Sequence, residues 1–309
     1  RVLFFSAKDN FWEMGDTGPC GPCTEIHVDR GPEACDMKGV PGHICKVNGD
    51  CARYIEIWNL VFIQYNRLPD GSLEPLPARH VDTGMGFERL VSIMQGKLSN
   101  YDTDLFSPLF AELTKLSGHT YGTLDAKDIA FRVIADHART LSIAITDGVN
   151  PGNVGRGYVL RRILRRAVRY GRQTLGLTEP FMPALAGVCA NIYSEIFPEI
   201  SQRLSHISQV LLSEENAFAR TIDNGIKKFE ELAERLANDG DATTLPGAEA
   251  FDLYSTFGFP KDLIELMARE RKLTLDEKGW AQAEADHEAA SAGKKRVFAE
   301  FNLEELDGL

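Results

Sequence analysis

Residues 82–90 read Asp82-Thr-Gly84-Met-Gly86-Phe-Glu-Arg89-Leu and combine an acidic residue, two closely spaced glycines and an arginine. Gly84 and Gly86 allow the backbone to come close to a ligand, because glycine has no side chain in the way. Asp82 and Arg89 place opposite charges near the two ends of the segment. Such a segment suits a zwitterion bound beside a polyphosphate. Glycines before a helix are also common in ordinary turns, so this interpretation needs support from elsewhere in the chain.

Two further blocks of sequence accompany this segment. Residues 9–25 read Asp-Asn-Phe-Trp-Glu-Met-Gly-Asp-Thr-Gly-Pro-Cys-Gly-Pro-Cys-Thr-Glu, and residues 54–67 read Tyr-Ile-Glu-Ile-Trp-Asn-Leu-Val-Phe-Ile-Gln-Tyr-Asn-Arg. Together the three blocks resemble the alanyl-tRNA synthetases, a family of class II aminoacyl-tRNA synthetases, whose third signature motif is similar to residues 82–90. The resemblance covers nearly the whole chain and is clearly lost only from Pro32 to Cys51.

The composition is that of a folded protein long enough for two cores: 309 residues, 43% hydrophobic and 26% charged. The chain has neither a secretory signal nor an apolar run of the roughly 18 residues that a membrane helix needs. We therefore expect a cytoplasmic protein without a membrane partner. A net charge of −11 argues against DNA as a partner and limits any nucleic-acid site to a local patch.

The two ends of the chain suggest a piece of a longer protein. It begins at Arg1 without a methionine and ends at Leu309 after an acidic stretch. The resemblance implies that the first two class II motifs, with the arginine that contacts the α-phosphate of ATP, precede Arg1. On this interpretation the fragment holds half of an active site and is inactive alone.

The periodicity predicts an α+β fold. The apolar, β-rich run 54–65 predicts a long strand covered on both faces, followed by an extended segment 74–81 and a helix over 84–94. The later pattern is helical. The resemblance identifies residues 1–96 as the C-terminal part of a class II antiparallel β-sheet catalytic domain and residues 97–309 as a mostly α-helical tRNA-recognition domain. The expected helices cover residues 105–116, 128–145, 157–170, 182–197, 200–236 and 248–257.

An alanine pocket is implied by the resemblance, which puts Asp82 on the α-ammonium and leaves room beside Gly84. A carboxylate suits an ammonium in a partly desolvated pocket. A difference of one methylene changes the discrimination of a pocket between substrates by only about 1–3 kcal/mol, so serine and glycine should also enter this pocket. This agrees with the separate editing domain of the family. The residues expected around alanine are Trp12, Asn59, Val61, Asp82 and Gly84, with Trp12 and Val61 enclosing a space matched to a methyl group.

ATP and Mg²⁺ are likewise implied by the resemblance, which assigns Glu56, Gly86 and Arg89 to ATP. Arg89 resembles the arginine that lies on the adenine and reaches the terminal phosphates. Glu56 and Asn59 resemble the pair that class II enzymes turn toward Mg²⁺. Buried polar groups need hydrogen-bond partners, and for Glu56 and Asn59 the ligand can supply these partners. The alternative is that the two side chains only form hydrogen bonds with backbone groups of neighbouring segments. The alanine carboxylate attacks the α-phosphate of ATP, and the tRNA ribose then attacks the adenylate, so catalysis consists of positioning and charge neutralisation.

Five of the six cysteines lie close together in the sequence, at Cys20, Cys23, Cys35, Cys45 and Cys51. The Cys20-x-x-Cys23 spacing favours half of a zinc site or a redox pair, so a zinc-binding domain is an alternative function. However, this spacing belongs to the active-site loop of the family, and disulfides are unusual in the cytosol. The zinc-type motif of the family lies in its editing domain, expected beyond Leu309. We therefore assign no metal ligand, and neither His27 nor His43 is named as one.

Seven arginines and no acidic residue lie between Arg156 and Arg172. The apolar residues among them follow helical spacing, so one face should be buried. An exposed charged face usually carries counter-charges one turn away, and their absence favours contact with tRNA phosphates. The alternative is a solvated face. The residues expected to bind tRNA are Asn153, Arg156, Arg161, Arg162, Arg165, Arg166, Arg169 and Ser255.

Asn153 lies in a glycine-rich loop before the arginine run and suits contact with base edges in the shallow groove of an RNA helix. The resemblance assigns it to the G·U wobble pair in the acceptor stem of tRNA(Ala). Its partner in the family is an aspartate, whereas Ser255 stands there in this chain and brings no charge. The function expected is an alanine–tRNA ligase acting on L-alanine, ATP and tRNA(Ala), and the alternative is a tRNA-binding paralogue without aminoacylation.

Overall fold

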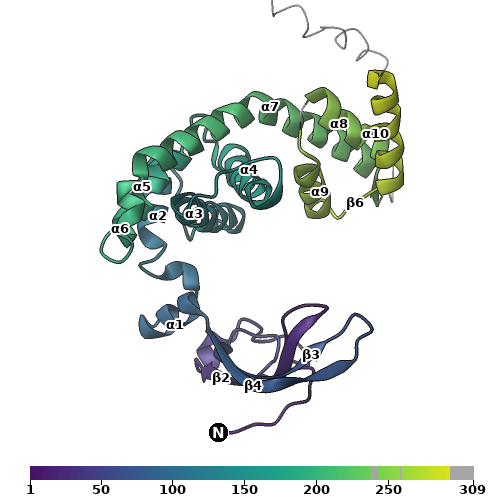
Figure 1. The fold of residues 1–309 in the computed structure, drawn as a ribbon. Helices are drawn as coiled ribbons and strands as arrows, with labels where there is room; N and C mark the ends of the chain where they lie inside the picture. The colour runs from purple at the N-terminus through teal and green to yellow at the C-terminus, as the bar shows by residue number, and fades with distance from the viewer. Residues whose placement is uncertain (239–242, 258, 293–309) are drawn as a thin grey trace, which may run out of the picture. The chain divides into compact units, whose positions relative to one another are not determined.

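The computed structural model describes residues 1–238, 243–257 and 259–292. The chain divides into two compact units, Arg1–Ser107 and Pro108–Leu309. The N-terminal unit contains a sheet and one α-helix, and the C-terminal unit is mostly helical (Figure 1). The predicted α+β class is therefore confirmed.

The sheet of the N-terminal unit is an antiparallel meander in the order β1-β2-β3-β4. Its strands are β1 (Phe11–Glu13), β2 (Gly18–Asp29), β3 (Tyr54–Arg67) and β4 (Leu73–Met85). A tight turn joins β3 to β4, where Asp70 accepts a hydrogen bond from the backbone N–H of Ser72 at 2.9 Å. In contrast, β2 and β3 are joined by the long segment 30–53, which contains one 3-10 turn, η1 (Pro32–Ala34).

The predicted strand β3 is present, but the expectation that it is covered on both faces is wrong. Val61 is its single buried residue, and Phe62 is 38% exposed. Within the unit, α1 (Phe87–Met94) is the α-helix that packs on β3. An apolar run shows that a strand tolerates burial, but it does not show that another layer covers it.

The helix expected over residues 84–94 begins later, at Phe87. Residues 82–85 belong to β4 and pair with β3. Gly86 is the N-cap, with extended backbone angles (φ −71°, ψ 100°), and its N–H donates to the carbonyl of Ile57 at 3.0 Å. The hydrogen bonds between β3 and β4 thus keep residues 82–85 extended as far as the N-cap, Gly86. Beyond α1, the 3-10 turn η2 (Asn100–Asp102) packs against that helix.

The C-terminal unit consists of nine helices and one short parallel strand pair in its described residues. Helix α7 packs against α3, α4, α5 and α6 along its first part and against α8 further on (Figure 1). None of the described helices is long and apolar enough to cross a membrane. The helices are α2 (Ser107–Ser117), α3 (Asp125–Thr146), α4 (Gly155–Leu175), α5 (Met182–Tyr193), α6 (Pro198–Gln202), α7 (Leu204–Asn238), α8 (Gly247–Phe257), α9 (Lys261–Glu270) and α10 (Glu277–Ala292), and the strands are β5 (Thr244–Leu245) and β6 (Thr274–Leu275).

A buried carboxyl group on α7 holds the start of α5. Glu215 is 2% exposed and accepts hydrogen bonds from the N–H groups of Phe181 at 3.0 Å and Met182 at 3.1 Å. These are N–H groups that a helix leaves unpaired at its first turn. Burial raises the pKa of Glu215 to about 7, although the two backbone donors and Arg172 lower it. The folded protein therefore holds this proton more tightly than the unfolded chain.

Replacing Glu215 with Gln should remove a pH dependence of stability. The protonated carboxyl stabilises the fold fully below the ordinary pKa of 4.5, and this contribution disappears as the pH rises through about 7. The shift in pKa corresponds to about 3 kcal/mol of unfolding free energy. The difference in unfolding free energy between Glu215→Gln and wild type should therefore shift in favour of the variant between about pH 5 and about pH 8. Urea unfolding measures it, with Glu234→Gln on the exposed face of α7 as control. A pH-independent difference between Glu215→Gln and wild type would contradict the assignment.

Candidate functional site

A β-bulge in β3 determines which polar side chains share one face of the sheet. Glu25 of β2 pairs with Asn59, and two residues later His27 pairs with Glu56. Directly paired residues point to the same face, as do residues two apart on one strand. Because Ile57 is an extra residue on β3, Glu56 and Asn59 come to the same face although they are three apart in the sequence. A regular strand would put them on opposite faces.

Four of the five residues expected around alanine lie side by side on β3 and β4. Asn59 pairs with Gly84, and Val61 pairs with Asp82, so the four positions form two neighbouring rows on the same face. A Cβ atom added to Gly84 would meet no atom within 4 Å, so the space above it is open. The fifth residue, Trp12, is half-buried on β1, two strands away from β3.

Polar groups around Asn59 are incompletely paired. Its Nδ2 donates to Glu25 at 3.4 Å, while its buried Oδ1 has no hydrogen-bond partner in the described residues. A buried acceptor without a donor costs about 1–3 kcal/mol. Burial raises the pKa of Cys23 on the same face, although a hydrogen bond with Asn59 lowers it. Asp82 is exposed and accepts a hydrogen bond from the N–H of Thr83 at 2.8 Å.

Arg89 folds back from α1 over the bulge. Its Nη1 donates to the backbone carbonyl of Glu56 at 2.9 Å and lies 3.4 Å from the carboxylate of the same residue. A Cβ atom at residue 86 would lie 2.9 Å from the Arg89 Cδ, so Gly86 leaves room for this conformation. Glu56 and Arg89 line a cavity of about 320 Å³ together with His27, Asn48 and other residues.

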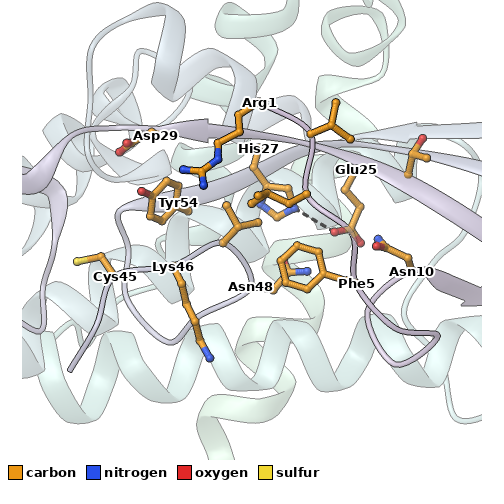
Figure 2. A pocket seen from close by; sticks show the side chains of 14 residues that line it. Arg1, Phe5, Asn10, Glu25, His27, Asp29, Cys45, Lys46, Asn48 and Tyr54 are labelled. Carbon is orange, nitrogen blue, oxygen red and sulfur yellow. Dashed lines mark hydrogen bonds and ion pairs between the residues drawn. The ribbon is translucent and has the colours of Figure 1, made fainter. Parts of the chain in front are cut away.

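A larger cavity of about 820 Å³ lies on the same face, where Figure 2 shows His27 and Glu25 directed at each other. The His27 Nε2 and the Glu25 Oε2 are 3.0 Å apart. Glu25 was not expected at a site, and His27 was considered only as a metal ligand, although Cys23, Glu25 and His27 alternate along β2 and therefore share a face. Neither cavity is lined by the residues expected around alanine.

The structure separates the five clustered cysteines into two places. Cys20 and Cys23 are buried in β2, whereas Cys35, Cys45 and Cys51 lie in the segment between β2 and β3. His43 joins the second group, and the four ligand atoms all lie within 4.8 Å of one another. The five cysteines therefore do not form one cluster in the structure, and His43, which was not named as a ligand, lies with three of them. The signal in the sequence was the spacing His43-x-Cys45-x5-Cys51.

Arginines of α4 form ion pairs with acidic residues of other helices. In the described part of the chain, four of the seven arginines are paired in this way. The acidic partners that α4 itself lacks are thus supplied by α7 and α9. The sequence of α4 alone cannot reveal partners on other helices. The pairs are Arg161 with Glu214 at 2.5 Å, Arg162 with Asp262 at 3.1 Å, Arg169 with Glu270 at 2.6 Å and Arg172 with Asp223 at 3.4 Å.

Arg169 is only 2% exposed, so the expectation that it contacts tRNA is wrong. Its guanidinium binds both carboxylate oxygens of Glu270. Partial burial raises the pKa of Glu270, but the hydrogen bond and charge of Arg169, with smaller contributions from Tyr170 and Arg166, together outweigh it and hold the pKa below its ordinary value. The fork-shaped guanidinium matches the carboxylate geometry, which is typical of a structural ion pair.

The remaining candidates for tRNA contact differ in exposure. Asn153 accepts a hydrogen bond from Arg161, and Ser255 is exposed on α8. Arg156 is exposed, whereas the guanidinium of Arg165 lies 5.3 Å from the centre of the Phe218 ring. Burial and then the charge of Arg161 lower the pKa of Arg165. A cavity of about 270 Å³ between α3, α4 and α9 is lined by His137, Arg162, Arg166 and Arg269, among others, of which His137 and Arg269 were not expected at a site.

Residues 1–307 match the family model described as tRNA synthetases class II (A). The chain belongs to this family. The synthetase chain is 54% identical to the alanine-tRNA ligase of Chlorobium chlorochromatii (strain CaD3) over 91% of its own length and 31% of the relative. It is 51% identical to that of Cytophaga hutchinsonii, over 94% and 33%, and 47% identical to that of Flavobacterium psychrophilum, over 97% and 34%. It spans about a third of the length of these relatives.

In this synthetase chain, Arg169→Ala should lower the free energy of unfolding by about 2–3 kcal/mol, because it leaves the Glu270 carboxylate without its partner. Arg162→Ala removes an ion pair whose arginine side chain is 46% exposed and should cost less than about 1 kcal/mol. Urea unfolding compares the two variants. Replacing both Arg169 and Glu270 with Met should recover much of the loss. Equal destabilisation by Arg169→Ala and Arg162→Ala would contradict a structural role for Arg169.

Proposed function

We propose that this chain carries the alanine pocket, the third class II motif and the acceptor-stem-binding helices of an alanine–tRNA ligase. Such an enzyme activates L-alanine with ATP and transfers it to the 3′ end of tRNA(Ala). The observation that carries the proposal is the bulged face of the sheet, which gathers Glu56, Asn59, Val61, Asp82 and Gly84. Membership of the class II (A) family and the names of the relatives support it.

Alanine would bind over the two rows formed by β3 and β4. The exposed carboxylate of Asp82 offers the α-ammonium a charged acceptor, and the open space above Gly84 leaves room for it. The unpaired Oδ1 of Asn59 needs a donor, which an ammonium can supply. Val61, which is buried beside Asp82, would border the methyl group.

ATP would bind next to Glu56 and Arg89. Arg89 is held by the backbone carbonyl of Glu56, so its planar guanidinium is oriented before the nucleotide arrives. The Glu56 carboxylate is a third exposed and supplies the oxygen chemistry that Mg²⁺ prefers, so the residues present fit the ion. When bound, Mg²⁺ would neutralise phosphate charge. The residues of the chain bind and orient the two reactants, and no side-chain nucleophile is needed.

The acceptor stem of tRNA would contact the loop before α4 and the exposed arginines of that helix. Arg161, fixed by Glu214, donates to the Oδ1 of Asn153 and thereby leaves the amide NH₂ group of Asn153 as the donor for a base edge. The exposed Arg156 and Arg162 and the half-buried Arg166 remain as the candidates for phosphate contact. In this proposal Arg161 positions Asn153, and Arg169 stabilises the helix.

Asp82→Asn should reduce alanine-dependent ATP/pyrophosphate exchange in the enzyme that carries this chain. Loss of a charge-assisted hydrogen bond is worth about 2–3 kcal/mol, which corresponds to about 30- to 150-fold in kcat/KM for alanine. The KM for ATP should change little. Asp70→Asn, in the turn between β3 and β4, serves as control and should retain exchange. Unchanged exchange in Asp82→Asn would sink the assignment of the ammonium site.

Removing the charges of Arg162 and Arg166 should weaken tRNA binding and flatten its salt dependence. Each lost phosphate contact should lower the slope of log K against log salt by about 1. Arg172→Gln is the matched control, because this arginine lies on the same helix but its side chain is only 16% exposed, against 46% for Arg162. Filter binding over a salt series measures the slope. An unaltered slope in Arg162→Gln/Arg166→Gln, or an equal change in Arg172→Gln, would return these arginines to a purely structural role.

A further inference from the structure

The segment 30–53 between β2 and β3 has little regular structure apart from η1. Cys35 and Cys51 nevertheless are 7% and 5% exposed, and Cys45 and His43 beside them are half-buried. The three thiols and the imidazole come from three separate positions along the segment, yet their ligand atoms converge within 4.8 Å. Convergence of soft donors in a segment without a large apolar core points to a ligand that holds it together.

The distances are close to those of a tetrahedral metal site. Zinc bonds of about 2.3 Å to sulfur and 2.0–2.1 Å to nitrogen separate the ligand atoms by about 3.5–3.8 Å. The Nε2 of His43 lies 3.3 Å from the Sγ of Cys35 and 3.4 Å from the Sγ of Cys45. Since the largest separation is 4.8 Å, shifts of about 1 Å suffice to complete the tetrahedron.

We propose that Cys35, His43, Cys45 and Cys51 bind one Zn²⁺ in a tetrahedral Cys₃His site. Thiolate and imidazole ligands favour zinc over magnesium or calcium, which prefer oxygen. Four protein ligands leave no position for water or substrate, so the site is structural and not catalytic. Cys20 and Cys23 are not ligands.

Hydrogen-bond donors face two of the sulfur atoms. The N–H of Met37 donates to the sulfur of Cys35, and the guanidinium of Arg53 contacts the sulfur of Cys45. Arg53 is itself oriented by Asp29, with Nε and Nη2 at 2.7 and 2.8 Å from the two carboxylate oxygens. Donors of this kind around metal-bound thiolates fix the ligands and balance their charge.

The site holds a turn that reaches both cavities on the sheet. Cys45 and Cys51 stand on either side of the turn formed by residues 46–49, in which the N–H of Gly49 donates to the carbonyl of Lys46 at 3.2 Å. Asn48 in this turn lines both cavities (Figure 2 shows the larger one). Zinc binding therefore fixes the turn over the face that carries Glu56 and Arg89.

Metal analysis of the purified protein tests the site. Cys35→Ser, Cys45→Ser and Cys51→Ser should each contain one zinc fewer per chain than wild type. Cys20→Ser and Cys189→Ser, which alter buried cysteines outside the group, should retain the wild-type content. His43→Ala should lose the zinc, whereas His43→Cys should retain it with four thiolates. Equal zinc content in wild type and Cys51→Ser, or a disulfide between Cys45 and Cys51 in protein kept under reducing conditions, would overturn the proposal.

Cobalt substitution reports the geometry independently of the amount of metal. Co²⁺ in this site should give the strong visible bands of tetrahedral coordination and a thiolate-to-cobalt charge-transfer band. Cys51→Ser should lose or shift these bands, and Cys20→Ser should not. The weak absorption of six-coordinate Co²⁺ in wild type would overturn the proposal.

Chelation should expose residues 36–50 to proteolysis while β2 and β3 stay protected. Uniform protection of this segment with and without zinc would contradict a structural role. A rise in the KM for ATP on chelation is a further expectation, and this part rests on the proposed function. If zinc loss opens the segment and leaves the KM for ATP unchanged, the metal site stands and the location of the ATP site fails.

Discussion

The candidate active site depends on one extra residue in β3. Ile57 changes which side chains of that strand share a face, so the carboxylate of Glu56 and the amide of Asn59 lie together. Its backbone carbonyl also accepts a hydrogen bond from Gly86, and the carbonyl of the preceding residue accepts one from Arg89. The bulge thereby fixes both the polar side chains of β3 and the start of α1, and it does so through backbone atoms.

The existence of β3, β4 and the helices α2 to α5, α7 and α8 could be predicted from the sequence, because long runs of one periodicity determine them. Helix α6 was merged with α7 in the expectation, and α9 and α10 were not predicted as separate helices. The start of α1 could not be predicted either. Residues 82–85 pair with β3 and stay extended up to Gly86, which the local sequence does not show. The bulge was equally hidden, since a pattern of apolar residues does not show where one strand carries a residue more than its partner.

The roles of single residues were hard to predict because their partners come from distant parts of the chain. The sequence of α4 shows its arginines, but it does not show that Glu214, Asp223, Asp262 and Glu270 approach from other helices. Likewise, the closely spaced Cys20 and Cys23 are held apart from the thiols that do converge. Spacing along the chain is informative for ligands on one turn or strand, and much less so for groups brought together by a long connection.

The segment between β2 and β3 is closed at its base by a backbone hydrogen bond from the N–H of Arg30 to the carbonyl of Arg53 at 2.9 Å. Asp36 adds a second closure by accepting a hydrogen bond from the N–H of Ala52 at 2.8 Å. The entropy cost of a closed loop grows only slowly with the number of residues inside it. Residues can therefore be gained or lost within this segment without changing the pairing of β2 with β3.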